Sequence, residues 1–361
     1  MRYNSVFTVV KRNAIKRNKL APAQFKKLKI KRILLISWGR MGEVALSTML
    51  VQLLRKRYLQ AHISYLVGKG GEEILKNDLD IDKFMMANAK VYRELAASQP
   101  YDLAIDLYAG CGSRLMVYLS GAKYAVFSEK PCVGATFLFT EGVKLARYND
   151  SNIKDYFENI LRLLGTKINR DELGHLRSRL SITKNEALSA ARFLEKKGIT
   201  AGDFVVGLQP GRHYEIWPES KYAETAQELI NKFKAKIIIF HGPGEKGSAE
   251  KIHSLMPRDS ILLPRLNIRD YFAILSRCNL LVTTIGGAAH AGAALDVPTA
   301  VILCRGQRDY WVPRCKDKSF YLPIISKVSY KSAEYNIPGG RVLLTTSVRQ
   351  VLKTIDKQPV M

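Results

Sequence analysis

Residues 32–43, RILLISWGRMGE, decide the fold class of this 361-residue chain. The run Arg32–Ser37 is almost continuously apolar, as in a strand buried on both faces of a parallel sheet. The turn Trp38–Gly42 contains two glycines. Apolar positions then recur at near-helical spacing, which predicts an amphipathic helix over about Glu43–Tyr58. Strand, tight turn and helix in this order begin a βαβ unit.

The same alternation runs through the rest of the chain and restarts near residue 180. Strands alternating with helices predict parallel sheets, so we expect two doubly wound α/β halves. The further strands are expected at His62–Val67, Leu103–Leu107, Phe204–Leu208, Lys236–His241, Leu280–Thr284 and Thr299–Cys304. The further helices are expected at about Ile153–Leu164, Lys184–Lys197, Ser220–Phe233, Ile268–Cys278 and Ser347–Ile355.

The expected domain boundaries follow from this alternation. A basic leader covers residues 1–30, a first α/β domain 31–179, a second α/β domain 180–344, and a closing helical segment 345–361. In doubly wound folds ligands bind beyond the carboxyl ends of the strands. With two such sheets, the expected site is the cleft between them.

Net charge points to an anionic partner. The chain has 57 Lys and Arg against 32 Asp and Glu, a net charge of +25. Nucleic acid, an acidic membrane leaflet or a phosphorylated substrate each fit this excess. Residues 1–42 hold twelve basic residues and no acidic one. Residues 1–32 therefore either lie on anionic lipid, at ~1 kcal/mol per basic residue near the surface, or form a solvated, flexible extension.

Cysteine usage and hydropathy indicate a cytoplasmic protein, with the inner face of the cytoplasmic membrane as a peripheral location. No run of about 18 apolar residues occurs, so no membrane-spanning helix is expected. The five cysteines show no C-x-x-C spacing, and Cys278 and Cys304 lie in apolar surroundings. We therefore expect reduced thiols rather than a disulfide framework or a zinc site.

Glu43 is the first candidate functional residue, because it follows a strand and a glycine turn. Either it is an acidic residue that stabilises the helix dipole, or it is a general base directed into the cleft. The spacing Gly39-x-x-Gly42 does not match the dinucleotide fingerprint G-x-G-x-x-G.

Three loops of the second half are candidates for binding a nucleotide. In Gln209–Pro218, Gly211 and Arg212 follow a strand, so the loop is either structural or a phosphate contact. In Thr283–His290, the glycine pair Gly286 and Gly287 opens a small-residue helix whose free amides suit a diphosphate, with His290 as a further donor. In Phe240–Glu245, the carboxylate of Glu245 either binds ribose hydroxyls or belongs to a plain turn.

These motifs, in this order, resemble the ADP-heptose:lipopolysaccharide heptosyltransferase family (glycosyltransferase family 9). The resemblance covers about residues 31–356. It rests on Ile33–Ser37 with Met41–Val44, Tyr101–Asp106, Val206–Gly211 with Trp217-Pro218, Gly242–Glu245, the Gly-Gly-x-x-His step that ends at His290, Ala293–Pro298 and Trp311-x-Pro313.

The resemblance implies the glycosyltransferase B-type fold, an α/β fold of two Rossmann-like doubly wound domains facing across a cleft. The closing helix would pack back on the domain junction. The first domain would bind an anionic glycolipid acceptor, the lipopolysaccharide inner core. The second would bind a nucleotide-sugar donor, ADP-heptose. Transfer would invert the anomeric carbon and require no metal and no cofactor.

The same resemblance assigns site residues. Glu43 would be the catalytic base. Arg212, Thr284, Gly286, Gly287 and His290 would bind the donor diphosphate, and Gly211 and Glu245 its nucleoside. Cations on the first domain would contact the acceptor, and the candidates are Arg40, Lys69 and Arg114.

The chain departs from the family pattern at three positions. The carboxylate at the first turn is Glu43, one methylene longer than the usual Asp. The usual donor-loop Lys is Glu215, which would repel a diphosphate, so Arg212 or Lys221 would have to substitute. The usual Asp-Ser/Thr-Gly before the His is Thr284-Ile285-Gly286, which keeps the backbone amides and loses the carboxylate.

Three rival functions stay open on the sequence. A non-catalytic, membrane-associated or scaffold protein on the same fold agrees with the departures. A nucleotide-sugar epimerase has a similar two-domain shape. Nucleic-acid binding would explain the charge, but no recognition motif or aromatic platform supports it, so nucleic acid is not an expected partner.

Overall fold

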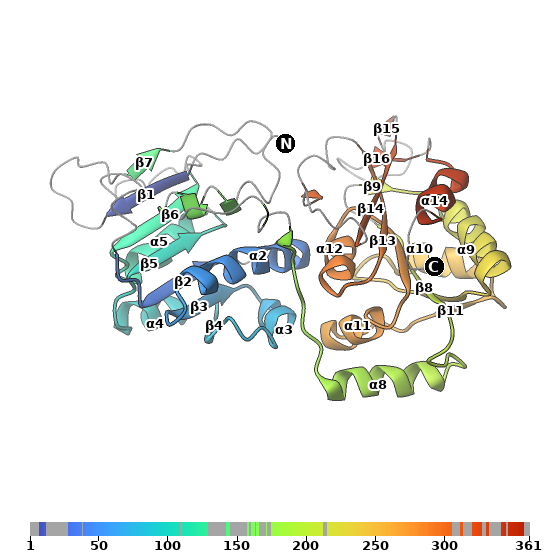
Figure 1. Ribbon diagram of the computed structural model, residues 1–361, viewed down its shortest axis with the longest axis horizontal. Helices are drawn as coiled ribbons and strands as arrows, with labels where there is room; N and C mark the ends of the chain where they lie inside the picture. The colour runs from blue at the N-terminus through green and yellow to red at the C-terminus, as the bar shows by residue number, and fades with distance from the viewer. Residues whose placement is uncertain are drawn as a thin grey trace. The chain divides into compact units, whose positions relative to one another are not determined.

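The computed structural model divides the chain into two compact units, residues 1–177 and residues 178–361 (Figure 1). The residues that it describes are 7–11, 28–37, 39–108, 110–128, 142–144, 157–158, 160–162, 164–165, 171, 175–211, 215–304, 311–312, 320–326, 330–331, 341–343 and 346–356.

The sheet of the first unit has seven strands in the order β4-β3-β2-β5-β6-β1-β7. The five strands from β4 to β6 are parallel to one another, and β1 and β7 are added at the β6 edge through antiparallel pairs. The strands are β1 (Phe7–Lys11), β2 (Arg32–Ile36), β3 (His62–Val67), β4 (Lys83–Met86), β5 (Leu103–Asp106), β6 (Tyr124–Ser128) and β7 (Gly142–Lys144).

Helices pack on this sheet because its strands are apolar on both faces. Leu34 and Ile36 belong to the cluster that α4 and α5 cover, and the alternate residues Ile33 and Leu35 are fully buried on the opposite face. The helices are α2 (Met41–Arg57), α3 (Gly71–Leu75), α4 (Val91–Ala97) and α5 (Cys111–Leu119).

The basic leader is not wholly an extension outside the fold, which corrects the expectation for residues 1–30. Residues 7–11 form β1, which pairs antiparallel with β6 on one side and β7 on the other (Figure 1). The segment Phe-Thr-Val-Val is rich in β-branched and aromatic residues, which favour a strand once a partner edge is available.

The sheet of the second unit has six parallel strands in the order β11-β10-β8-β12-β13-β14. Buried residues run continuously along β8, β12 and β13, as expected for strands covered on both faces. The strands are β8 (Val205–Gln209), β10 (Lys236–Ile239), β11 (Ser260–Leu262), β12 (Leu280–Thr284), β13 (Thr299–Cys304) and β14 (Tyr321–Ser326). A small separate sheet joins β15 (Tyr330–Lys331), β16 (Arg341–Val342) and β9 (Glu215–Ile216).

Helices cover both faces of the second sheet. Residues of α9, α10 and α14 form one core cluster with alternate strand residues, and Ala289 of α12 packs on the other face with Val301 and Leu303. The helices are α8 (Lys184–Glu195), α9 (Glu219–Phe233), α10 (Lys246–Leu255), α11 (Ile268–Leu275), α12 (Gly287–Ala294) and α14 (Val348–Ile355).

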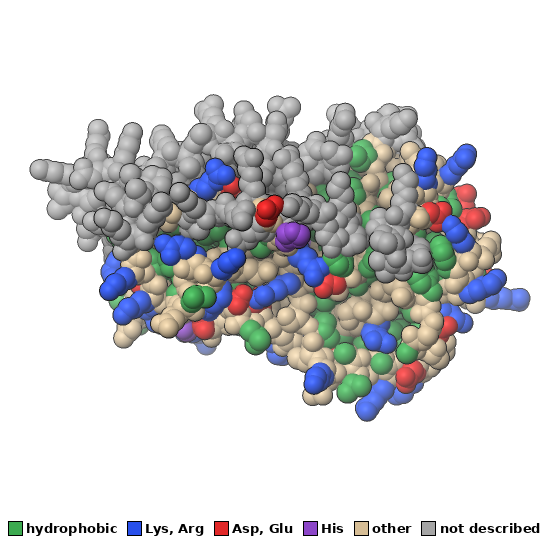
Figure 2. All heavy atoms as spheres, in the orientation of Figure 1, with side chains coloured by type: hydrophobic (Ala, Val, Ile, Leu, Met, Phe, Trp, Pro, Cys, Tyr) green, Lys and Arg blue, Asp and Glu red, His purple; other side chains and the backbone are tan. Residues whose placement is uncertain are grey.

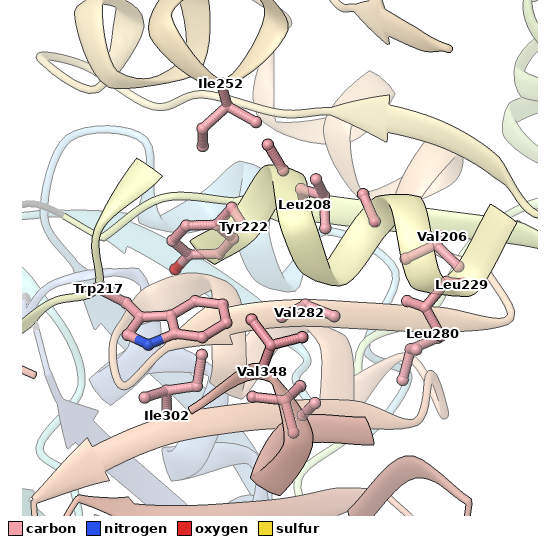
Figure 3. Close-up of a cluster of buried hydrophobic side chains, with 14 of the residues drawn as sticks. Val206, Leu208, Trp217, Tyr222, Leu229, Ile252, Leu280, Val282, Ile302 and Val348 are labelled. Atoms are coloured by element: carbon pink, nitrogen blue, oxygen red, sulfur yellow. The ribbon is translucent and has the colours of Figure 1, made fainter. Parts of the chain in front are cut away.

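Trp217 is the largest side chain of the second core. It is 1% exposed and lies edge-on to Tyr222 at a centroid distance of 4.9 Å (Figure 3). Its Nε1 donates to the carbonyl oxygen of Thr346 at 3.1 Å, which satisfies the buried indole N–H. This bond ties the start of α9 to the chain just before α14.

The closing helix α14 is held on the second unit. It packs against α9, β13 and β14, and its buried residues Val348, Val351 and Ile355 belong to the same core cluster as Trp217. The capping box of Ser347 and Gln350 fixes where this helix begins.

One cysteine differs from the expectation of reduced thiols. Cys278 and Cys304 are free and buried, and burial raises the pKa of the Cys278 thiol. Cys111, at the exposed start of α5, is disulfide-bonded. The expectation holds where the thiol is enclosed by apolar side chains and fails where it is accessible.

Basic side chains are spread over the described surface of the face shown in Figure 2, with acidic side chains between them. Within the parts of the chain that the structure describes, no helix is both long enough and apolar enough to cross a bilayer.

Candidate functional site

Both parallel sheets have the Rossmann strand order, so each has one topological switch point where ligands are expected. In the first unit it lies between β2 and β5, where Ile36 pairs with Asp106. In the second it lies between β8 and β12, where Gln209 pairs with Thr283. Every predicted site residue that the structure describes lies in or just after a strand of one of these two sheets, or in the helix that follows it.

Glu43 is the third residue of α2 and is exposed. Its Oε2 accepts a hydrogen bond from the backbone amide of Arg40 at 3.1 Å, so the Glu43 side chain satisfies the N-cap amide at the helix start. The carboxylate folds over Gly39, where an added Cβ would lie 1.9 Å from Oε2. Among the described residues no donor contacts Oε1, so one oxygen remains available to a ligand.

The candidate acceptor cations follow three neighbouring strands of the first sheet. Arg40 follows β2, Lys69 follows β3, and Arg114 lies in the first turn of the helix that follows β5. Arg40 and Lys69 are exposed, whereas Arg114 is buried. All three therefore lie beyond the carboxyl edge of one sheet.

Asp106 at the end of β5 is a polar residue of this edge that was not predicted as a site residue from the sequence. It is fully buried, and its two carboxylate oxygens accept from the amide of Tyr108 at 3.0 Å and from the hydroxyl of Ser113 at 2.7 Å. These bonds fix the loop between β5 and α5, and with it the position of Arg114.

The start of α12 supplies unused backbone donors. Gly286 is its N-cap, in extended backbone geometry and without a side-chain cap, and a Cβ added there would meet no atom within 4 Å. Among the described residues no hydrogen-bond acceptor contacts the amides of Gly287, Ala288 and Ala289. Amides and helix dipole together favour an anion at this position.

Small residues bring α12 close to the sheet. A Cβ on Gly292 would lie 2.5 Å from Oγ1 of Thr299 and 2.9 Å from Cδ2 of Leu281, so only glycine fits this approach. Thr284, the last residue of β12, is 1% exposed. The candidate diphosphate residues Thr284, Gly286 and Gly287 therefore form one continuous strand-to-helix junction.

His290 is a buried, neutral residue in the same helix. Its Nδ1 lies 2.7 Å from the hydroxyl of Tyr321, and its ring lies beside Trp311 and Tyr321. Burial lowers the pKa of His290 to about 4. The contact with Tyr321 fits either tautomer of the neutral ring. In the tautomer whose Nδ1 accepts from the Tyr321 hydroxyl, the proton is on Nε2, which has no hydrogen-bond partner among the described residues.

Glu245 is connected to the same switch point through Gln209. It caps α10, is half-buried, and its Oε2 accepts from the backbone amide of Gly242 at 2.6 Å and from Nε2 of Gln209 at 3.0 Å. Gln209 is the last residue of β8, and Gly211 lies two residues after it. The two candidate nucleoside residues therefore follow neighbouring strands.

The structure describes only some of the residues at and around the departure from the family pattern in the donor loop. Arg212 and the side chain of Glu215 lie outside the described residues. Nζ of Lys221 donates to the carbonyl oxygen of Thr346 at 2.8 Å, and burial lowers the pKa of this lysine. The structure thus gives Lys221 a bond within its own domain, next to Trp217.

Four residues of these two edges were not predicted as site residues from the sequence: Asp106, Gln209, Tyr271 and Tyr321. Asp106 and Gln209 each end an apolar strand with a polar side chain, and that pattern could have marked them. Tyr271 lies in α11 and Tyr321 begins β14, and no local signal shows that they reach Gln209 and His290.

Comparison with known proteins identifies the family. The model of glycosyltransferase family 9 (heptosyltransferase) matches residues 89–317, which is more than half of the chain. The chain belongs to glycosyltransferase family 9. The match of the family 9 model includes Gly211, Glu245 and His290 and begins after Glu43.

Individual family 9 relatives are distant in sequence. Lipooligosaccharide heptosyltransferase 2 of Haemophilus influenzae is 22% identical over 205 residues, which span 53% of this chain and 59% of that relative. The chain thus matches less than two thirds of the length of this relative.

Solved structures agree in fold. A family 9 glycosyltransferase from Veillonella parvula has a TM-score of 0.76 at 20% identity, covering 94% of this chain and 98% of its own. The ADP-heptose lipopolysaccharide heptosyltransferase II of Escherichia coli has a TM-score of 0.68 at 16% identity, covering 90% and 97%. Similarity over nearly whole chains confirms the predicted glycosyltransferase B-type fold of two Rossmann-like domains.

Proposed function

We propose that this family 9 protein is an inverting, metal-independent glycosyltransferase that moves a heptose from ADP-heptose to the inner core of lipopolysaccharide or a related glycan. The observation that carries the proposal is the start of α12 at the switch point. There the amides of Gly287, Ala288 and Ala289 have no acceptor among the described residues, and a Cβ on Gly286 would meet no atom within 4 Å. Family membership and the E. coli relative named for ADP-heptose support this donor.

The chemistry divides between the two domains. Glu43 takes the proton from an acceptor hydroxyl as its oxygen attacks the anomeric carbon of the heptose. The bond from that carbon to the diphosphate oxygen breaks on the opposite face, and ADP leaves with the electron pair. The configuration is therefore inverted. Positioned carboxylates of this kind contribute roughly 10²–10⁴-fold in rate.

Backbone amides stabilise the charge of the leaving diphosphate. The amides of Gly287, Ala288 and Ala289 donate to its oxygens, and Nε2 of His290 adds a neutral donor. Arg212 supplies a positive charge. Fixed donors directed at developing charge need no reorganisation during the reaction, and each is worth about 3 kcal/mol. This set of donors supports catalysis without a metal.

The remaining predicted residues bind substrate. Glu245 and Gly211 bind the nucleoside. Arg40, Lys69 and Arg114 contact anionic groups of the acceptor beyond the first sheet. Residues 1–32 supply basic groups for an anionic membrane surface on the cytoplasmic side, where the glycolipid acceptor would be presented.

The test is a transfer assay with the purified chain, ADP-heptose and a heptose-deficient lipopolysaccharide acceptor, followed by mass spectrometry of the acceptor and by ADP release. We expect addition of one heptose, with ADP released in equal amount, and no loss of rate in EDTA. Absence of both transfer and ADP binding would refute the proposal.

A second candidate is a non-catalytic, membrane-associated or scaffold protein on the same fold. The use of Glu43 as a helix cap favours it, because that carboxylate already has a structural partner. It predicts neither transfer nor binding of a nucleotide-sugar, so calorimetry with ADP-heptose beside the transfer assay separates the two functions.

A further inference from the structure

Gln209 joins a tyrosine to the carboxylate of Glu245. The hydroxyl of Tyr271 donates to Oε1 of Gln209 at 2.7 Å, and Nε2 of Gln209 donates to Oε2 of Glu245 at 3.0 Å. These three side chains come from α11, β8 and the start of α10. The hydrogen-bonded chain is continuous from the buried Tyr271 to the half-buried Glu245.

The chemistry of the three groups fixes the direction of the chain. An ionised carboxylate can only accept, so the NH₂ group of Gln209 must face Glu245. The amide oxygen then faces Tyr271 and requires a donor. Glutamine suits the position because its amide donates at one end and accepts at the other.

Tyr271 is firmly placed to be that donor. It is 8% exposed, and its ring lies edge-on to Phe240 at a centroid distance of 5.3 Å. Burial, reinforced by the negative charge of Glu245, raises the pKa of Tyr271 well above its ordinary value, so the hydroxyl keeps its proton. The backbone amide of Asp270 donates to Oδ1 of the N-cap residue Asn267, and this bond fixes the start of α11, the helix that contains Tyr271.

The two protein donors contact the same oxygen of Glu245. Oε2 accepts from both the amide of Gly242 and Nε2 of Gln209. Among the described residues no donor contacts Oε1. The carboxylate is thereby held in one orientation, with one oxygen saturated by the protein and the other available to a hydroxyl donor.

We propose that Tyr271 and Gln209 are positioning residues that hold Glu245 for a ribose hydroxyl and so make the donor site selective for ribonucleotides over deoxyribonucleotides. The inference rests on the proposed function, because it takes Glu245 as a nucleoside-binding residue. Tyr271 acts through Gln209 and has no need to contact the nucleotide.

The experiment compares the binding of ADP, 2′-deoxy-ADP and 3′-deoxy-ADP to the full chain by calorimetry. The unaltered protein should lose about tenfold or more in affinity when one of the two hydroxyls is removed, since one hydrogen bond to a charged group is lost. Tyr271→Phe should weaken ADP binding severalfold. It should leave nearly unchanged the binding of the deoxy-ADP that the unaltered protein binds more weakly than ADP. The selectivity ratio would then fall by the same factor as the ADP affinity.

Tyr222→Phe is the matched control. This tyrosine is fully buried in the same domain, and its hydroxyl lies 3.4 Å from the backbone oxygen of Gln209 without contacting the amide side chain. It also interacts with Gly211 and Thr284, so its loss is expected to change ADP and deoxy-ADP affinity by the same factor. Its removal should leave the selectivity ratio unchanged. A merely structural role of Tyr271 would weaken ADP and deoxy-ADP binding by the same factor in the Phe variant, and that result would overturn the proposal.

A double variant tests whether Tyr271 acts through Glu245 or by a general effect on the fold. If Tyr271 acts through Glu245, Glu245→Gln should also abolish the selectivity, and adding Tyr271→Phe should reduce it no further. Additive losses would contradict the relay. ADP binding with no discrimination between ribose and either deoxyribose in the unaltered chain would refute the relay alone, whereas absence of any ADP binding would overturn it together with the proposed function.

Discussion

Oε2 of Glu43 accepts a hydrogen bond from the backbone amide of Arg40 at 3.1 Å, so the proposed catalytic base also caps its own helix. The two roles are compatible, because the bond occupies one carboxylate oxygen and restrains the side chain. A carboxylate held by a backbone donor is already oriented, which reduces the entropy lost when an acceptor hydroxyl binds to the other oxygen.

Replacement of Glu43 by Gln separates these roles. The amide oxygen of Gln can still accept from Arg40, so the helix cap should survive and the free energy of unfolding should change by less than about 1 kcal/mol. The general base is lost, so kcat should fall by about 10²–10⁴-fold. ADP affinity, measured by calorimetry, should stay within about twofold, because the donor site lies in the other domain.

Glu43→Asp then tests the reach of the side chain. Asp restores the carboxylate with one methylene less, so activity above that of the Gln variant would show that the charge matters more than the length. Full activity of Glu43→Gln would exclude Glu43 as the base.

Gly39 is expected to control the position of the same carboxylate. An alanine Cβ at residue 39 would lie 1.9 Å from Oε2 of Glu43, so the carboxylate must move away. We expect kcat to fall by roughly 10²-fold, as for an active-site group displaced by about 1 Å. Gly202→Ala is the control, since a Cβ there meets no atom within 4 Å. Equal steady-state rates for the two alanine variants would show that the position of Glu43 is not important.

Burial of His290 makes stability depend on pH. Its pKa in the folded protein is about 4, below the ordinary value of about 6.5. The unfolded chain therefore binds a proton that the folded chain does not, and stability falls as the pH drops from about 6.5 towards 4. Between pH 7 and pH 5 the unaltered protein should lose about 2 kcal/mol more than His290→Gln.

The measurement is the urea midpoint of unfolding of both proteins at the two pH values. Gln can still pair with the Tyr321 hydroxyl, so the two proteins should differ little at pH 7. A parallel loss in both between pH 7 and pH 5 would mean that His290 is accessible to solvent and titrates normally.

Local sequence patterns were sufficient to predict the parallel sheets. We expected a strand before a turn at the apolar run Arg32–Ser37, and the structure confirms it as β2. We also expected a strand leading into a helix between Thr283 and His290, and the structure confirms these as β12 and α12. Such runs carry their own signal, because a strand buried on both faces needs continuous apolar residues.

Interactions between distant segments were not predictable. Strand β1 exists only because β6 and β7 offer edges to residues 7–11, so its basic surroundings suggested an extension instead. Tyr271 reaches Gln209 across 62 residues, and Tyr321 reaches His290 across 31. The sequence indicated Glu245 and His290 as site residues, but their partners depend on tertiary packing that no local pattern encodes.

The most direct test of the account is ADP binding by Gly286→Asp. The site over Gly286 has room for a side chain, and an N-cap Asp would accept from the free amides of α12 and stabilise the helix. The melting temperature should hold or rise, while the carboxylate excludes the diphosphate. We predict that ADP affinity falls by at least about thirtyfold, since one or more charge-assisted bonds are lost. Unchanged ADP affinity in a folded Gly286→Asp protein would contradict the account.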